Sequence, residues 1–229
     1  MSEKEQPNLF AIRTVATALG PLLGELVLVG GCAVGLLVSD KARPPVRHTI
    51  DVDLLAEITS KWHYAQLGEQ LRQLGFREAG DYICRWKKNG IVVDIMPQDP
   101  SILGFTNTWY ADTIKHAIST ALQDGTQIRH AAPPYFLATK LESFNGRGKG
   151  DFSHHDLEDV ITLVDGRAEL LAEVDNADPH VRSFIQDEMD ELLATTAFIE
   201  TVPWHLGPSE VEQARVELVI ERMRSLAGL

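Results

Sequence analysis

Cysteine and long hydrophobic runs are scarce in this sequence of 229 residues. Its two cysteines, Cys32 and Cys84, form no Cys-x-x-Cys pair, so we expect buried free thiols in a reducing cytoplasm and no disulfide framework. The longest apolar-rich stretch, residues 26–38, is interrupted by glycines and is shorter than the roughly 20 residues that span a bilayer. The first residues lack a cationic segment followed by an apolar run. We therefore expect neither a membrane span nor a signal peptide.

Positive charge is also in short supply, because 21 lysines and arginines face 33 aspartates and glutamates and the formal net charge is −12. This balance argues against the broad basic surface of a nucleic-acid-binding domain. The cations nevertheless gather in three short groups, so an RNA partner would contact only a small patch, with a modest salt dependence. The groups are Lys41, Arg43 and Arg47; Arg85, Lys87 and Lys88; and Lys140, Arg147 and Lys149.

The composition is otherwise that of a globular protein, with 44% hydrophobic and 24% charged residues. In the first 131 residues, predicted helices and strands alternate. The Asn89-Gly90 pair is a strong signal for a hairpin turn between two strands. Hydrophobic periodicity predicts helices over 9–19 and 62–74 and from residue 33, strands over 26–29, 50–55, 82–86, 91–96, 113–121 and 126–130, and a loop over 41–47.

The pattern changes at Pro133-Pro134, after which only helical periodicity follows. Strands and helices followed by helices alone indicate an α+β fold. We expect an α+β domain over residues 1–131 and a helical domain over residues 132–229. The four predicted helices of the second domain cover 135–145, 154–164, 180–198 and 209–226.

Three carboxylates stand out in the first domain. Asp51 and Asp53 are two apart on a predicted strand, so both side chains leave the same face, about 6 to 7 Å apart at the backbone. Asp94 interrupts an otherwise apolar strand, where a bare carboxylate would be costly if buried. Three oxygen donors suit Mg²⁺. The alternatives are a solvated strand face for the Asp-x-Asp pair and, for Asp94, a strand end that reaches solvent before Pro97.

Gly30 and Gly31 follow the short apolar run at residues 26–29. Glycines after a strand let backbone amides approach phosphate oxygens without a Cβ in the way, and a following helix adds its N-terminal dipole. The sequence contains neither the Gly-x-Gly-x-x-Gly dinucleotide motif nor a P-loop at this point. Taken alone, the pair is compatible with a simple turn.

The order of these features resembles the DNA-polymerase-β-like nucleotidyltransferase superfamily. That pattern has an apolar residue, Gly-Gly or Gly-Ser, then Asp-x-Asp or Asp-x-Glu, and a third acidic residue on a separate strand. Residues 28–33 and 47–54 look like the branch that contains the AbiEii-type abortive-infection toxins. Residues 136–144, 147–151 and 155–160 are similar to its lysine-containing helix and the aspartate-rich helix that follows. The resemblance covers roughly residues 27–167, and the second position is Gly31 rather than serine.

The resemblance implies a mixed β-sheet flanked by helices and a transfer of a nucleoside monophosphate from a nucleoside triphosphate to a hydroxyl. It assigns Asp51, Asp53 and Asp94 to catalysis and to binding Mg²⁺, with two ions, and makes Asp94 the base toward the acceptor. The nucleotide-binding residues it implies are Gly30, Gly31, Arg47, Thr49 and Lys140. The implied partners are an RNA acceptor such as tRNA or a protein hydroxyl, and an antitoxin.

Several alternatives remain open at this stage. Lys140 and Arg147 are compatible with a solvated helix face, and Ser153 with Asp156 at N3 is similar to a capping box. The His155-Asp156 pair, with His116 or His130 and Asp187, suits a metal-dependent His-Asp phosphohydrolase. Asp-x-Asp also serves glycosyltransferases, and a non-catalytic nucleotide-binding or interaction module could share the same fold.

Overall fold

The computed structural model describes residues 7–40, 46–80, 82–148 and 150–229. The chain divides into two compact units, each described here by itself. The first unit comprises Met1–Leu36 and Arg47–Ala132, and the second comprises Leu37–Val46 and Pro133–Leu229. Among the described residues, none of the helices combines the length and hydropathy that crossing a bilayer requires.

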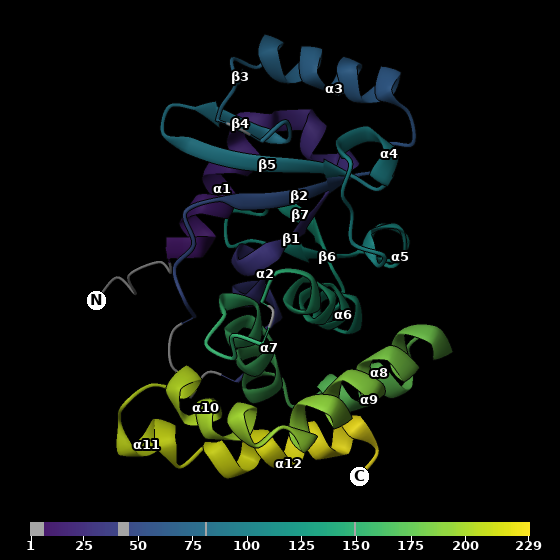
Figure 1. Ribbon diagram of the computed structural model, residues 1–229. Helices are drawn as coiled ribbons and strands as arrows, with labels where there is room; N and C mark the ends of the chain where they lie inside the picture. The colour runs from purple at the N-terminus through teal and green to yellow at the C-terminus, as the bar shows by residue number, and fades with distance from the viewer. Residues whose placement is uncertain (1–6, 41–45, 81, 149) are drawn as a thin grey trace, which may run out of the picture. The chain divides into compact units, whose positions relative to one another are not determined.

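The first unit is built on a mixed sheet of seven strands in the order β3-β4-β5-β2-β1-β7-β6 (Figure 1). The central strand β2 pairs antiparallel with β1 and parallel with β5, and β1 pairs parallel with β7. This confirms the predicted α+β class and the mixed sheet. The strands are β1 (Leu26–Val29), β2 (Val52–Ala56), β3 (Arg77–Glu78), β4 (Arg85–Lys88), β5 (Ile91–Pro97), β6 (Ile118–Ala121) and β7 (Gln127–His130).

Helices cover this sheet because their apolar stripes need burial. The stripe of α1 (Pro7–Leu19) is buried where the helix packs on β2 and β5. Helix α2 (Gly30–Leu37) follows β1 directly, and the predicted helix from residue 33 therefore begins three residues earlier. The remaining helical segments of the unit are η1 (Gly20–Glu25), α3 (Lys61–Gln73), α4 (Pro100–Leu103) and α5 (Tyr110–Lys115).

The sequence-based prediction of the first unit is confirmed at β1 and at the β4–β5 hairpin, whose turn residues Asn89 and Gly90 have φ values of 48° and 84°. It is wrong over 113–121, because Tyr110–Lys115 forms α5 and the strand starts only at Ile118. Short apolar stretches do not distinguish a buried strand from one helical turn. The hairpin strand predicted from residue 82 starts at Arg85. Residues 41–45 of the loop predicted over 41–47 lie outside the described residues.

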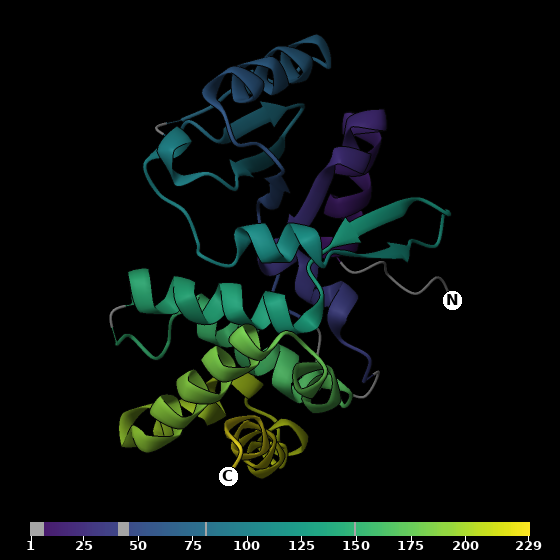
Figure 2. The same cartoon turned by 90° about the vertical axis from the view of Figure 1, so that its right-hand side faces the viewer.

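From Pro133 on, the described residues of the second unit are mainly helical (Figure 2). Helix α7 (His155–Gly166) is nearly all buried and contacts α6 (Pro133–Ser143), α10 (Thr196–Leu206) and α12 (Val216–Ala227). The helix predicted over 180–198 is two helices, because α9 (Pro179–Ala194) ends before Thr195. The helix predicted over 209–226 is divided into α11 (Glu210–Gln213) and α12. The short helix α8 (Leu170–Asp175) was not predicted, and a π-helical turn, η2 (Phe144–Gly148), follows α6.

The segment Leu37–Asp40 belongs to the second unit, whereas the predicted boundary after residue 131 left it in the first. Polar contacts explain the difference. The backbone amides of Ser39 and Asp40 both donate to the carbonyl of Gly166 at 2.9 Å. The Arg215 guanidinium donates to the Asp40 carboxylate at 2.7 Å. A single cut in the sequence therefore cannot separate the two units.

Candidate active site

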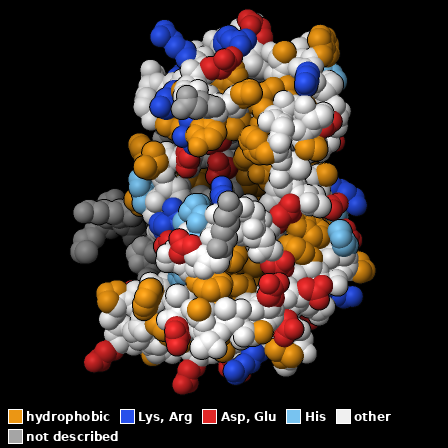
Figure 3. Space-filling view, viewed as in Figure 1, with side chains coloured by type: hydrophobic (Ala, Val, Ile, Leu, Met, Phe, Trp, Pro, Cys, Tyr) orange, Lys and Arg blue, Asp and Glu red, His pale blue; other side chains and the backbone are white. Residues whose placement is uncertain are grey.

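The three predicted carboxylates converge at β2 and β5 of the first unit. Asp53 on β2 is in register with Asp94 on the parallel neighbour β5. In-register residues on adjacent strands are about 4.8 Å apart and share one face, so the two carboxylates are neighbours. Asp51 lies in the bend just before β2 rather than on the strand. In Figure 3, acidic side chains reach the surface over the sheet, beside hydrophobic ones.

Arg85 joins two members of this acid cluster, which we define as Asp51, Asp53 and Asp94. Its Nε and Nη2 donate to the two oxygens of Asp94 at 2.8 and 2.6 Å, and Nη2 also donates to Asp51 at 2.8 Å. The hydrogen bonds to Asp94, together with the charges of Asp94, Asp51 and Asp53, raise the pKa of Arg85 above its ordinary value against the effect of burial. Its guanidinium also lies 5.4 Å from the ring centre of Tyr82.

In the sequence, Arg85 stands out only as one of a group of cations, although a signal for its position is present. A two-residue turn at Asn89-Gly90 pairs Lys88 with Ile91, and counting back along both strands pairs Arg85 with Asp94. The predicted hairpin therefore already placed a cation opposite the acidic residue that interrupts the apolar strand.

Gly30 makes room for the carboxylate of Asp53. A Cβ at residue 30 would lie 1.9 Å from Asp53 Oδ2, and its φ of +67° is one that L-residues rarely adopt. The predicted tight turn is therefore confirmed at Gly30, where α2 begins. Gly31 is buried in the first turn of that helix. Backbone amides of α2 thus start next to the acid cluster, and phosphate binding by the two glycines stays a prediction.

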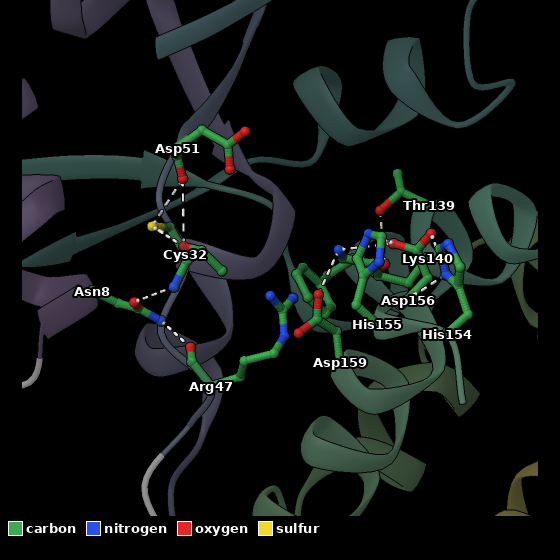
Figure 4. A network of polar contacts seen from close by, with 12 residues as sticks. Asn8, Cys32, Arg47, Asp51, Thr139, Lys140, His154, His155, Asp156 and Asp159 are labelled. Carbon is green, nitrogen blue, oxygen red and sulfur yellow. Dashed lines mark hydrogen bonds and ion pairs between the residues drawn. The ribbon is translucent and has the colours of Figure 1, made fainter. Parts of the chain in front are cut away.

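The segment that carries Asp51 is fastened to α1 and α2 (Figure 4). The buried Asn8 accepts from the amide of Thr49 at 3.1 Å and donates to the carbonyl of Arg47 at 2.8 Å. Cys32 Sγ lies 2.8 Å from the Thr49 hydroxyl and donates to the Asp51 carbonyl at 3.3 Å. Thr49 is thus part of the scaffold of Asp51, while nucleotide binding by Thr49 and Arg47 stays a prediction. Asn8 is not among the residues predicted from the sequence, where its one signal is a polar side chain at the start of an apolar helix.

Two further ionisable groups border the acid cluster and stay neutral near pH 7. Burial and the nearby Asp94 raise the pKa of the Cys84 thiol to about 11. Burial, followed by the charges of Cys84 and Asp94, raises the pKa of Tyr64 well above its ordinary value. The Tyr64 hydroxyl donates to the carbonyl of Ile95 at 3.0 Å. At neutral pH both groups therefore carry their protons.

Lys140, the cation that the resemblance assigned to the triphosphate, is buried within the second unit (Figure 4). Its Nζ lies 2.6 Å from Asp159 and 3.2 Å from Asp156, both on α7. Because this ammonium is buried and ion-paired, the solvated-face alternative is wrong for Lys140. Whether it contacts a triphosphate stays a prediction.

Asp156 is fully buried and receives several cationic contacts. Arg147 binds both of its oxygens, at 2.7 and 2.8 Å. Burial by itself would raise the pKa of Asp156, but the hydrogen bonds from Arg147 and the charge of Lys140 lower it to about 2. The capping-box alternative is wrong, because the cap of α7 is His154, whose Nδ1 accepts from the Asp156 amide at 3.2 Å.

Comparisons with known proteins give matches among solved structures. No model of a protein family matches the sequence, and no curated protein matches it. An antigenic nucleotidyltransferase-like protein from Paracoccidioides brasiliensis matches with a TM-score of 0.51 and 20% identity, covering 86% of this chain and 92% of that one. A nucleotidyltransferase candidate from H. pylori matches with a TM-score of 0.50 and 11% identity, covering 100% and 96%. This chain has the nucleotidyltransferase-like fold.

The side chains of the acid cluster have the donor chemistry of a magnesium site. Its donors are carboxylate oxygens alone, which Mg²⁺ prefers, and Gly30 keeps a Cβ away from Asp53. Among the described residues, only His154, His155 and Asp156 bring three ligand atoms within 4.8 Å of one another, a spacing that the acid cluster does not meet. Asp156 already binds Lys140 and Arg147, just as Asp51 and Asp94 already bind Arg85, so at either place a metal ion would meet a positive charge.

The His-Asp phosphohydrolase alternative also needs His116 or His130. Both lie in the first unit, and each has a ring nitrogen that contacts a group other than a metal ligand. Both ring nitrogens of His130 have partners, the Thr120 hydroxyl at 2.8 Å and the Ala131 carbonyl at 2.9 Å. His116 Nδ1 lies 2.9 Å from the Asp112 carbonyl. The remaining residue of that alternative, Asp187, lies on α9.

Proposed function

We propose that this chain is a magnesium-dependent nucleotidyltransferase, which moves a nucleoside monophosphate from a nucleoside triphosphate to an acceptor hydroxyl. The observation that carries the proposal is the convergence of three carboxylates from β2, β5 and the bend before β2, with Gly30 against Asp53. The shared fold of the two nucleotidyltransferase-like structures supports the same class of reaction.

In the proposed reaction, the acceptor oxygen forms a bond to the α-phosphorus. The bond from that phosphorus to the oxygen bridging to the β-phosphorus breaks, and pyrophosphate leaves with the electron pair. Asp94 takes up the hydroxyl proton. Asp51, Asp53 and Asp94 would hold two Mg²⁺ ions, and the chemistry such ions supply is activation of the hydroxyl and charge neutralisation at pyrophosphate.

The experiment that tests this proposal is a transfer assay with labelled nucleoside triphosphates, Mg²⁺, and cellular RNA or protein. We expect label in an acceptor with the wild type and a loss of at least about a hundredfold with Asp53→Asn. Asp99→Asn is the matched control, because Asp99 caps the short helix α4 and asparagine caps equally well. Wild type that transfers no label, or Asp53→Asn with full transfer, would contradict the proposal.

The AbiEii-type resemblance supports a narrower proposal, that the chain is the toxin of a toxin–antitoxin pair with tRNA or a protein hydroxyl as acceptor. We expect growth arrest when the wild type is expressed without an antitoxin and normal growth with Asp53→Asn. Normal growth at a high level of the wild-type protein would count against this role while leaving nucleotidyl transfer possible.

A second candidate function is a nucleotide-binding module without catalysis. Arg85 favours it, because this cation already binds two of the carboxylates that a metal would need. Calorimetry with each triphosphate measures binding, and its comparison with the transfer assay distinguishes the two functions. Binding without transfer to any acceptor supports the module, whereas binding with transfer supports the enzyme.

A further inference from the structure

Arg85 binds carboxylate oxygens that a metal ion held by the acid cluster would need. It makes two of its hydrogen bonds to Asp94 and one to Asp51, all between 2.6 and 2.8 Å. The side chains of Arg85 and Asp94 are only 27% and 13% exposed, so water screens this charge pair weakly. A planar guanidinium that binds one carboxylate through two nitrogens forms a strong ion pair.

A divalent cation needs oxygens of the same carboxylates. Both oxygens of Asp94 and one of Asp51 already accept hydrogen bonds from Arg85. A metal ion bound beside the guanidinium would place two like charges in one half-buried site, which costs free energy. Arg85 therefore opposes metal binding for as long as it stays in the cluster.

We propose that Arg85 is the internal counter-ion of the acid cluster and competes with divalent metal for Asp51 and Asp94. The affinity of the protein for metal is then set by Arg85 as well as by the three carboxylates. This inference rests on the proposed function only in taking the cluster to be a metal site.

The local structure keeps Arg85 close to the cluster after it is displaced. Its backbone is held opposite Asp94 by the β4–β5 ladder, and its amide donates to the Tyr82 carbonyl at 3.0 Å. The Tyr82 ring, 62% exposed, already lies beside the guanidinium in its paired position, so an aromatic face for a cation–π contact stays within reach of Arg85. Displacement thus requires rotation of one side chain and no change in the sheet.

Competition predicts effects of opposite sign on stability and on metal affinity. Without metal, loss of Arg85 leaves neighbouring carboxylates that repel one another, so the protein is less stable. With metal, the same loss removes the competitor, so binding is tighter. If Arg85 only stabilised the sheet, its loss would lower the stability of the protein without tightening metal binding.

The test is a titration of the full chain with Mn²⁺, a spectroscopic stand-in for Mg²⁺, followed by electron paramagnetic resonance. We expect Arg85→Gln to bind Mn²⁺ about tenfold or more tightly than the wild type, with Arg85→Lys between them. Arg72→Gln is the control, because Arg72 pairs with Glu69 and Glu78 on the surface of the first unit. In EDTA, Arg85→Gln should melt below the wild type, and Mn²⁺ should raise its melting temperature more.

Equal or weaker Mn²⁺ binding by folded Arg85→Gln overturns the inference. If Arg85→Gln does not fold in EDTA, the Mn²⁺ affinity of Arg85→Lys is compared with that of the wild type, and equal or weaker binding again overturns the inference. If no variant binds Mn²⁺, both this inference and the metal dependence of the proposed function fail. If the wild type and Arg85→Gln bind Mn²⁺ equally, only the inference fails, and the transfer assay judges the proposed function separately.

Discussion

Gly30 and Asp53 approach so closely that a Cβ on residue 30 would lie 1.9 Å from the carboxylate oxygen Oδ2. Gly30 is the first residue of α2, and Asp53 lies beside β1 on the adjacent strand. The position of a candidate metal ligand is therefore fixed by the absence of a side chain at the preceding strand–helix junction. Gly20 provides a natural comparison, since its φ is +56° but nothing lies within 4 Å of its Cβ position.

The first prediction concerns Gly30→Ala. Both Gly30→Ala and Gly20→Ala place an L-residue at positive φ, which costs about 1 to 2 kcal/mol in each case. Only Gly30→Ala must also move Asp53, so we expect it alone to lose Mn²⁺ binding. Urea unfolding measures the shared cost, and Mn²⁺ titration measures the difference. Equal Mn²⁺ affinities of the two variants would show that Asp53 takes no part in binding metal.

The second prediction concerns Asn8, which fastens the segment before β2. Asn8→Ala leaves the amide of Thr49 and the carbonyl of Arg47 without this partner. We expect the free energy of unfolding to fall by about 1 to 3 kcal/mol, measured with urea. Asn176→Ala, at an exposed site, should cost much less. A similar loss in both variants would mean that Asn8 does not anchor the segment.

The third prediction concerns the buried cation of the second unit. Lys140→Met leaves Asp156 and Asp159 buried beside each other without their shared ammonium. Breaking a buried ion pair from one side costs about 3 to 5 kcal/mol, so we expect a large loss of stability in urea. The exposed Lys115 gives the control variant Lys115→Met. If the double change Lys140→Met with Asp159→Asn is no more stable than Lys140→Met, charge burial is not the cause.

The fourth prediction concerns pH. The folded protein lowers the pKa of Asp156 from 3.8 to about 2, mainly because Arg147 and Lys140 offset the effect of burial. A lowered folded pKa contributes stability above the unfolded value, and this contribution is lost as the pH falls from about 4 to about 2. The shift corresponds to about 2 kcal/mol.

The measurement is the free energy of unfolding against pH for the wild type and Asp156→Asn. We expect the stability of the wild type to fall more steeply between about pH 4 and pH 2, because only the wild type has this carboxylate to protonate. Parallel curves for the two proteins would contradict the assignment of the shift to Asp156.

The sequence was most informative where local patterns determine structure. The buried run at Leu26–Val29, the Gly-Gly pair and the Asn-Gly hairpin predicted β1, the turn and the β4–β5 pair. The α+β class followed from the order of these elements. The two-residue turn also determines which residues of the two strands face each other, and it thereby pairs Arg85 with Asp94.

What the sequence did not reveal depends on contacts between distant residues. Asn8 and Thr49 meet only because α1 packs on the sheet, and no local pattern connects them. The burial of Lys140 follows from the packing of α6 against α7, whereas its sequence neighbours are compatible with a solvated face. The helix at Tyr110–Lys115 is too short for periodicity to identify.

The attachment of Leu37–Asp40 to the second unit has a consequence for recombination of the gene. The hydrogen-bond partners of this segment include Gly166, Arg167, Glu169 and Arg215, and all of these lie beyond residue 132. A chimaera joined after residue 131 would therefore combine the segment with a foreign helical part that lacks its partners. The two units can be exchanged between related proteins only if Leu37–Val46 is transferred together with the C-terminal half.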